Sequence, residues 1–324
     1  MAALLEVEGL RVRLPTPTGF ATVVDGVDYH VEPAQVFGVA GESGSGKTMS
    51  MLALLGLLPA GAVVEGRASF GGKDLLRLRG SQLRAVSGRE IGMVFQDPLT
   101  SLHPMLSIGR QLTDHVRLHL GLGREAALRR AATLLEQVRI PDPTSALHAY
   151  PHQFSGGMRQ RIAIAIALAC NPRLLIADEP TTALDVTVQA GILRLLDSLR
   201  RDFELSVVLI THDLGVMSSI ADRVSIFYAG RVVESGPRNE LLRQPRHPYT
   251  RALLEALPHP EAAQDTPLIA IRGAPPSPQR IPPGCPYHPR CPYAIDVCTT
   301  DDPLLAPVGG RRLACHVDPF ADAE

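Results

Sequence analysis

The chain has 324 residues, enough for two or three domains. Hydrophobic residues make up 45% of it and charged residues 20%, which predicts a sizeable core and argues against global disorder. The net charge of −1 gives no electrostatic reason to expect nucleic-acid binding. The most prominent apolar stretch, residues 162–170, is much shorter than the roughly 20 residues of a membrane span, and the first residues lack the pattern of a secretory signal. We therefore expect a soluble, cytoplasmic protein.

The first ninety residues are rich in predicted strands. Apolar residues alternate at 4–12 and 23–31, and residues 36–40 form a short buried run that leads into a glycine-rich loop. An apolar helix is predicted at 47–58, ending before a proline, and another buried strand at 91–95.

Helices are predicted between residues 98 and 165, and the alternation of strands and helices resumes at residue 174. This alternation indicates a parallel sheet covered by helices. We expect a core made of residues 1–97 and 166–236, with a helical subdomain at 98–165 inserted into it. The predicted helices span residues 108–120, 124–138, 159–170 and 186–201, and the later strands span 174–177, 207–210 and 224–228.

The remaining residues, 237–324, are expected to form a separate extension. Residues 247–257 have the pattern of one amphipathic helix. Residues 273–284 contain five prolines and predict an extended linker. Four of the five cysteines lie beyond this linker.

A phosphate-binding loop is predicted at residues 41–48, because Gly41-x-x-x-x-Gly46-Lys47-Thr48 matches the P-loop pattern between a strand and a helix. Small residues let the backbone N–H groups curl around a phosphate, and the helix N-terminus adds attraction for anions. Lys47 would neutralise the β- and γ-phosphate oxygens, and the Thr48 hydroxyl would bind Mg²⁺. The residues expected to bind ATP here are Gly41, Ser43, Gly44, Ser45, Gly46, Lys47, Thr48 and Met49.

Polar residues follow three of the predicted strands, at the edge where parallel sheets bind ligands. Asp178 would hold Mg²⁺ through its water shell, and Glu179 is placed to orient or deprotonate the attacking water. His212 could contact the γ-phosphate, and Gln96 could reach Mg²⁺ or the attacking water.

A second anion site is predicted where Ser155-Gly156-Gly157-Met158 precedes a long helix. Ser155 is a good N-cap, and the two glycines leave backbone N–H groups uncovered. Because one phosphate loop already binds one ATP, a second site indicates a nucleotide supplied by another chain.

These motifs, in this order, resemble the nucleotide-binding subunits of ABC transporters over residues 1 to about 240. The resemblance implies a P-loop NTPase cassette of α/β class, with a RecA-like parallel sheet core, an antiparallel β subdomain and a helical subdomain. It also implies a head-to-tail dimer with a second ATPase subunit, a copy of this chain or a paralogue, that sandwiches two ATP molecules. Residues implied to contact the partner's ATP are Ser155, Gly156, Gly157, Met158 and Asp185.

The resemblance also bears on adenine binding and on catalysis. Phe20 lies where the family has an aromatic residue that stacks on adenine, with Tyr29 as a competing candidate. Phe154 and Met158 depart from the common Leu and Gln of the signature. Each catalytic position, Gln96, Glu179 and His212, is intact, so hydrolysis of ATP is implied.

The tail is similar to the dipeptide and oligopeptide importer branch, which includes nickel and other small-solute importers. The similarity rests on His247-Pro-Tyr-Thr-Arg251, on the cysteine-containing end, on Glu42-Ser-Gly-Ser45 and on Gln96-Asp-Pro98. It implies two transmembrane permease subunits, an indirect extracytoplasmic solute-binding protein, no nucleic acid, and a peripheral location on the cytoplasmic face of the cell membrane.

Four cysteines, Cys285, Cys291, Cys298 and Cys315, form the candidate metal site. Four thiolates suit Zn²⁺ or a [4Fe–4S] cluster. The absence of C-x₂-C pairs favours the cluster, whereas His288 and His316 are possible zinc ligands. Four reduced thiols without metal are the third possibility, and Cys170 is expected to be a buried small hydrophobe.

Two other functions compete with transport. One is a soluble ABC ATPase in translation or DNA repair, although such chains usually carry two cassettes or a long coiled-coil insert. The other is a redox-sensing or iron-sensing regulator in which the cysteines are the sensor.

Overall fold

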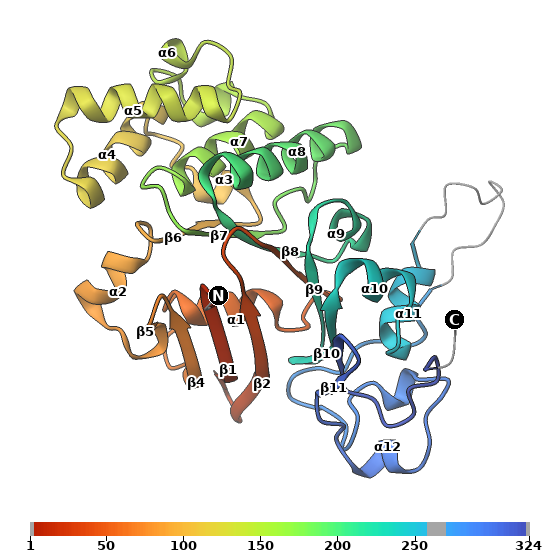
Figure 1. The fold of residues 1–324 in the computed structure, drawn as a ribbon. Helices are drawn as coiled ribbons and strands as arrows, with labels where there is room; N and C mark the ends of the chain where they lie inside the picture. Colours follow the sequence, from red (N-terminus) through yellow and green to blue (C-terminus); the bar gives the residue numbers. More distant parts are fainter. Residues whose placement is uncertain (1–2, 258–269, 322–324) are drawn as a thin grey trace. The chain divides into compact units, whose positions relative to one another are not determined.

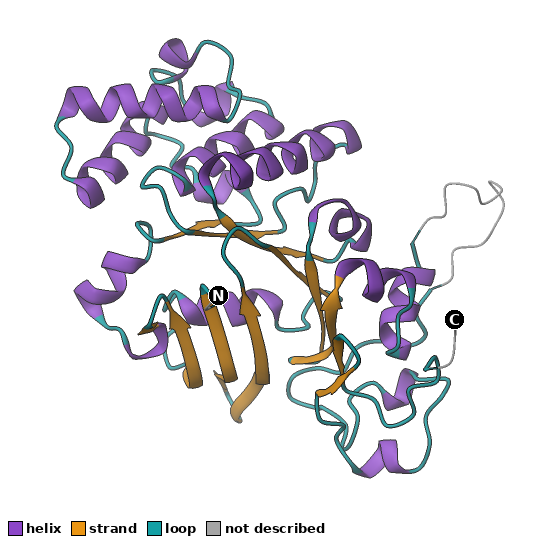
Figure 2. Cartoon of the chain, in the orientation of Figure 1, coloured by secondary structure: helices purple, strands orange, loops and turns teal. Residues whose placement is uncertain are grey.

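The computed structural model describes residues 3–257 and 270–321, which belong to two compact units (Figure 1). The first unit comprises residues 1–31, 36–77 and 211–324, and the second comprises residues 32–35 and 78–210. Strands occur in both units, and most of the longer helices belong to the second (Figure 2).

The first unit contains an antiparallel sheet in the order β2-β1-β4-β5. The apolar residues of β1 alternate with exposed ones, so that Leu5, Val7 and Val12 are buried on one face. A tight turn pairs Thr16 with Gly19 at the end of the hairpin. The strands are β1 (Leu5–Thr16), β2 (Gly19–Val31), β4 (Val63–Phe70) and β5 (Lys73–Asp74), followed by the 3₁₀ turn η1 (Leu75–Arg77).

A second group of strands in the first unit carries the phosphate loop. The fully buried β3 (Val36–Ala40) pairs in parallel with β9 (Arg223–Tyr228), and β9 pairs antiparallel with β10 (Arg231–Pro237). The extension adds the hairpin β11 (Ala306–Val308) and β12 (Arg311–Leu313) to β10. The helical elements of this unit are α1 (Lys47–Leu54), α9 (Leu214–Ile220), α10 (Arg238–Arg243), α11 (Pro248–Glu255), η3 (His288–Arg290) and α12 (Val297–Thr300).

The second unit combines three parallel strands with a helical region. Strand β7 (Leu174–Asp178) pairs in parallel with β6 (Ile91–Val94) and with β8 (Ser206–Thr211). Helix α7 packs closely on β6, because a side chain at Gly92 would lie 2.3 Å from the carbonyl oxygen of Ala167. The helical elements are α2 (Gly80–Val86), α3 (Pro98–Ser101), α4 (Ile108–Leu120), α5 (Arg124–Gln137), α6 (Pro143–Ala146), η2 (Pro151–Gln153), α7 (Gly156–Ala167) and α8 (Val186–Phe203).

Most predicted elements are confirmed, but several of their bounds are wrong, including those of two helices and of strands β1 and β2. Helix α1 ends at Leu54 rather than at residue 58, because Leu55 and Gly56 turn the chain before the proline is reached. Helix α7 begins at Gly156 rather than at Arg159, because the Ser155 side chain caps it by accepting a hydrogen bond from the N–H of Met158. The predicted linker at 273–284 has no helix or strand. None of the described helices is long and apolar enough to cross a membrane.

Candidate functional site

The phosphate loop connects β3 to α1 and depends on glycines with positive φ. Gly41 has φ 144° and Gly46 has φ 98°. A Cβ atom at Gly41 would lie 2.1 Å from the carbonyl oxygen of Phe227, and one at Gly46 would lie 2.4 Å from that of Val23. The loop therefore packs directly on neighbouring backbone, and only glycine fits at these two positions.

Lys47 begins α1 and is buried inside the loop. Its Nζ donates hydrogen bonds to the carbonyl oxygens of Gly41 at 2.7 Å and Glu42 at 2.8 Å. No side chain caps the helix at Gly46, and its first turn has no acidic residue. The uncovered N–H groups and the lysine make this end of α1 attractive to phosphate. Ser43, Gly44 and Ser45 complete the loop before α1, and Thr48 and Met49 follow Lys47 in its first turn.

The structure separates the two aromatic candidates for adenine stacking. Phe20 is 56% exposed at the start of β2, and the Arg13 guanidinium lies 5.9 Å from its ring centroid. Tyr29 is buried, stacks on Phe37, and points its hydroxyl at the sulfur of Met51. Burial raises the pKa of Tyr29 above its usual value. Tyr29 is therefore unavailable to a nucleotide, whereas Phe20 is accessible.

His212 directly follows Thr211, the last residue of β8, and belongs to the first unit. The next residue, Asp213, caps α9 by accepting hydrogen bonds from the N–H groups of Gly215 and Val216. This cap fixes the backbone on the C-terminal side of the histidine.

Glu179 is held by both its backbone and its side chain in the second unit. It follows Asp178, the buried last residue of β7, and has φ 45°, which is rare for a non-glycine residue. Its carboxylate accepts hydrogen bonds from Gln96 Nε2 at 2.9 Å and from the Thr182 hydroxyl at 2.8 Å. The two sequence-predicted residues are thus brought together, and Thr182 is a contact that no sequence motif indicated. Strained backbone of this kind is concentrated at functional sites.

The Ser155-Gly156-Gly157-Met158 segment occupies the N-terminus of α7. Ser155 and Gly156 are exposed, and a Cβ atom at Gly157 would lie 2.5 Å from a methyl group of Val188 in α8. Asp185 caps α8 by accepting a hydrogen bond from the N–H of Val188. The first turn of α7 therefore starts at exposed residues close to the start of α8, and a helix N-terminus is attractive to anions.

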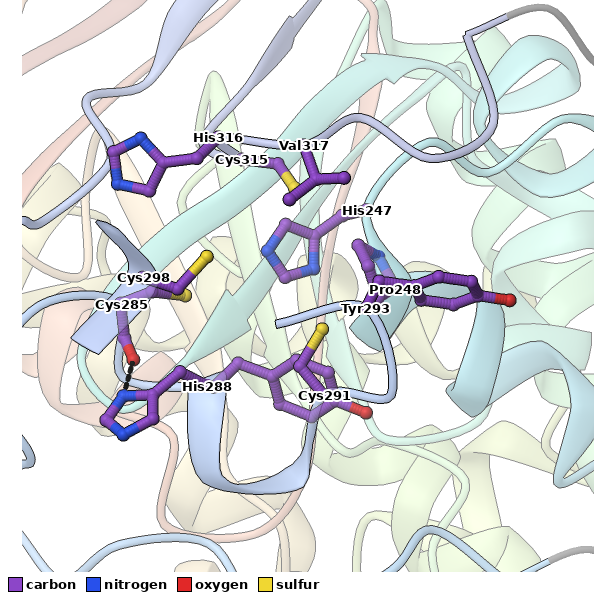
Figure 3. Close-up of a pocket in the computed structure, with 11 residues that line it drawn as sticks. His247, Pro248, Cys285, His288, Cys291, Tyr293, Cys298, Cys315, His316 and Val317 are labelled. Atoms are coloured by element: carbon purple, nitrogen blue, oxygen red, sulfur yellow. Dashed lines mark hydrogen bonds between the residues drawn. The ribbon is translucent and has the colours of Figure 1, made fainter. Parts of the chain in front are cut away.

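The four cysteines of the extension line one cavity of about 10 Å³, and Figure 3 shows their sulfur atoms turned toward a common space. Burial raises the pKa of Cys285 and Cys315, and it raises that of Cys291 to about 11, with the neighbouring sulfurs adding to the effect. Burial in this cavity therefore disfavours the thiolate form of these three cysteines. Cys170 lies elsewhere, in the second unit, and is buried as expected for a small hydrophobe.

The two histidines considered as zinc ligands bind backbone instead. The imidazole of His288 is hydrogen bonded through Nδ1 to the carbonyl of Cys285, and that of His316 through Nε2 to the carbonyl of Asp301 (Figure 3 shows the His288 contact). Within residues 3–257 and 270–321, no group of three or more histidine, cysteine or acidic side chains is arranged to hold a metal ion. The expectation of a metal site is therefore not supported by a preformed ligand geometry.

Arg290 is a site residue that the sequence motifs did not indicate. It lies between Cys285 and Cys291 and its side chain is 5% exposed. Its guanidinium pairs with Glu42 of the phosphate loop. The only signal in the sequence is an arginine embedded in a segment rich in proline and cysteine.

Comparison with protein families gives two matches along the chain. Residues 24–182 match a family described as "ABC transporter", and residues 233–298 match "Oligopeptide/dipeptide transporter, C-terminal region". The second match includes Cys285, Cys291 and Cys298, so it covers most of the cysteine pocket.

Curated relatives are similar over almost the whole chain. The oligopeptide transport ATP-binding protein OppD of Salmonella typhimurium is 45% identical over 96% of this chain and 93% of its own length. The dipeptide transport ATP-binding protein DppD of Escherichia coli is 46% identical over 99% of this chain and 98% of its own.

A solved structure extends the comparison to the fold. It is the dimeric post-hydrolysis state of an ATP-binding cassette bound to ADP and phosphate. It covers 72% of this chain and 98% of that chain, with 26% identity and a TM-score of 0.62.

The packing of Gly46 leads to a prediction about nucleotide affinity. In Gly46→Ala the new Cβ atom would collide with the backbone of Val23, so the loop must shift. If the shift leaves about 1% of the molecules with a competent loop, the affinity for ATP falls about 100-fold, which is the result we expect. Equilibrium binding of a fluorescent ATP analogue to the purified protein measures it.

Gly72→Ala is the matched control, because Gly72 has φ 84° but nothing within 4 Å of its would-be Cβ. It should lower stability by about 1–2 kcal/mol without changing ATP affinity. Equal affinity losses in both variants would contradict the role assigned to loop packing.

Proposed function

Since this chain belongs to the ABC transporter family of ATP-binding proteins, we propose that it is the ATP-hydrolysing subunit of an importer for dipeptides or oligopeptides. The observation that carries the choice of cargo is the match of residues 233–298 to the C-terminal region of oligopeptide and dipeptide transporters. The named peptide-transport relatives share the cassette and this extension, at 45–46% identity.

In this proposal the first unit binds the nucleotide. Phe20 stacks on adenine, and the loop residues 41–46 surround the β-phosphate with backbone N–H groups. Lys47 releases the carbonyls of Gly41 and Glu42 and binds the β- and γ-phosphate oxygens instead. Thr48 and Gln96 are the side chains that bind Mg²⁺. His212 contacts the γ-phosphate and reports its loss.

The second unit supplies the catalytic acid–base group. Glu179 acts as the base for the attacking water, and Asp178 holds Mg²⁺ through its water shell. The hydrogen bonds from Gln96 and Thr182 orient the Glu179 carboxylate. Gln96 therefore connects the base to the helical region that begins at α3.

The signature segment completes a pocket in a second ATPase subunit. Ser155, Gly156, Gly157 and Met158 present the N-terminus of α7 to the γ-phosphate held by the partner's loop, and Asp185 lies at the same interface. The dimeric cassette bound to ADP and phosphate supports this arrangement. The partner is a copy of this chain or a paralogue, and ATP binding drives their association.

The remaining partners follow from the role in import. Two permease subunits bind the helical region, a solute-binding protein delivers the cargo outside the membrane, and the ATPase lies on the cytoplasmic face of the cell membrane. Nickel or another small solute is the alternative cargo. A role in translation or DNA repair is disfavoured. The matched relatives are transport proteins, and the similarity extends over more than nine-tenths of their length.

We expect Glu179→Gln to bind ATP and form a stable dimer while losing about 10²- to 10⁴-fold in turnover, because the amide cannot accept a proton from water. Size-exclusion chromatography with ATP and a phosphate-release assay measure the two effects. Glu204→Gln is the control, since Glu204 also has positive φ (51°) in the second unit but follows α8. Hydrolysis by the Glu179 variant at the wild-type rate would refute the assignment of the base.

We expect peptide cargo to stimulate hydrolysis in the assembled transporter. The chain is reconstituted in liposomes with its permease subunits and solute-binding protein, and phosphate release is measured with dipeptides, longer peptides or Ni²⁺. Peptides should raise the rate several-fold, whereas nickel should not. Stimulation by nickel alone would assign the alternative cargo.

The cysteine pocket is proposed to bind a metal centre through Cys285, Cys291, Cys298 and Cys315. The convergence of four thiols on one cavity supports an all-thiolate donor set. A [4Fe–4S] cluster is preferred to Zn²⁺, for which C-x₂-C pairs would be expected. Ligation would require the thiols to adjust their positions and release their protons.

Anaerobic purification tests this proposal. We expect iron and acid-labile sulfide in the purified protein, together with visible charge-transfer absorbance, and loss of all three in Cys291→Ser. Cys170→Ala is the control, because Cys170 lies outside the pocket. Zinc at one equivalent would assign the other metal, and absence of both metals would leave four reduced thiols.

A further inference from the structure

An ion pair between Arg290, which is buried, and Glu42 joins the extension to the phosphate loop. Arg290 Nη1 donates a hydrogen bond to one carboxylate oxygen of Glu42 at 2.7 Å, and Nη2 donates to the other at 3.0 Å. The two residues are 248 positions apart and belong to the same unit. Two parallel hydrogen bonds from a planar guanidinium fix the orientation of the carboxylate as well as its position.

The backbone of Glu42 is fixed by two further contacts. Its N–H donates a hydrogen bond to the Tyr249 hydroxyl at 2.9 Å, and its carbonyl accepts one from Lys47 Nζ at 2.8 Å. The same residue is therefore held by the extension through its side chain and N–H, and by the phosphate-binding lysine through its carbonyl.

Arg290 is itself well ordered by its surroundings. Its Nε donates to the carbonyl of Arg272 at 2.7 Å, and Nη1 also lies 3.3 Å from the Tyr228 hydroxyl. Tyr228, Tyr249 and Tyr287 are buried and their rings contact one another at centroid distances of 4.6–5.3 Å. A charge this deeply buried is costly without its partner, so the pair keeps Glu42 and Arg290 together.

We propose that Arg290 is a positioning residue through which the extension holds the phosphate loop in its ATP-binding conformation and thereby sets the affinity for ATP. The proposal rests on the ATP-binding role given above to residues 41–48. Arg290 contacts no nucleotide and acts only through Glu42.

The expected effect is on binding rather than on chemistry. When only a fraction of the molecules has a competent loop, the apparent dissociation constant increases by the inverse of that fraction. The loop holds phosphates in the ground state and in the transition state alike, so its loss raises KM and leaves kcat nearly unchanged. A purely structural defect would instead lower the active fraction or the melting temperature.

A simple charge effect makes a different prediction, which separates it from positioning. Glu42 is an anion near the phosphate-binding loop, so removing its charge would strengthen ATP binding if repulsion alone mattered. Positioning requires the reverse, because Glu42→Gln loses the ion pair that holds the loop. The sign of the change in affinity for Glu42→Gln therefore decides between the two.

The experiment compares Arg290→Met, Glu42→Gln and the double variant in the full-length protein. Dissociation constants are measured with the fluorescent nucleotide mant-ATP, and KM and kcat with a phosphate-release assay. We expect each single variant to bind about tenfold more weakly with kcat within about twofold of wild type. The double variant should be no weaker than either single one, because both changes remove the same interaction.

Two further variants sharpen the interpretation. Arg290→Lys keeps the charge but not the bidentate geometry, so we expect an intermediate affinity. Arg251→Met is the control, since Arg251 forms an ion pair with Glu255 in α11 that does not touch the loop. It should leave mant-ATP affinity unchanged.

Tighter ATP binding by Glu42→Gln, wild-type affinity in Arg290→Met, or multiplying effects in the double variant would each overturn the proposal. If Arg290→Met does not fold, Glu42→Gln alone decides, because it leaves the extension unaltered. Wild-type protein that fails to bind mant-ATP would instead refute the proposed function of the loop.

Discussion

The close approach of the phosphate loop to neighbouring backbone is the constraint on which the ATP-binding half of this protein depends. Gly41 packs against the carbonyl of Phe227 in β9, and Gly46 against that of Val23 in β2. Two different sheets thus define the curvature of one loop, and Lys47 closes it from inside by binding two of its carbonyls. The N–H of Glu42 binds the Tyr249 hydroxyl, and the rest of the loop leads into the start of α1, which no side chain caps and which attracts anions.

The second unit also contains a helix with a glycine-rich N-terminus, α7, but this helix has a side-chain cap, which α1 lacks. Ser155 caps α7 with its own hydroxyl, so the two glycines after it belong to the first turn and keep their N–H groups uncovered. Glu179 is held differently, by a strained backbone and two hydrogen bonds to its carboxylate. Glu179 and its hydrogen-bond partner Gln96 belong to the second unit, whereas the phosphate loop belongs to the first.

The features that could be predicted from the sequence are those that depend on a local pattern of residues. Buried strands such as β3 and strongly periodic helices such as α4 and α5 agree with the structure, and the family assignment from the ordered motifs is confirmed by the curated relatives. Short elements of the first unit, such as β10, α9 and α10, carry too little periodicity to be recognised alone. The contact between Arg290 and Glu42 could not be predicted, because it joins residues that only the tertiary fold brings together.

The extension is connected to the phosphate loop along two independent routes. One is the side-chain route from Arg290 to Glu42. The other follows the sheet: β12 pairs with β10, β10 pairs with β9, and Phe227 of β9 carries the carbonyl against which Gly41 packs. Just beyond β9, the N–H of Gly230 donates to the carbonyl of Ser45 in the loop. The cysteine pocket flanks both routes in the chain, because Cys285 precedes Arg290 and Cys315 follows β12. A change at Glu42 interrupts only the first route.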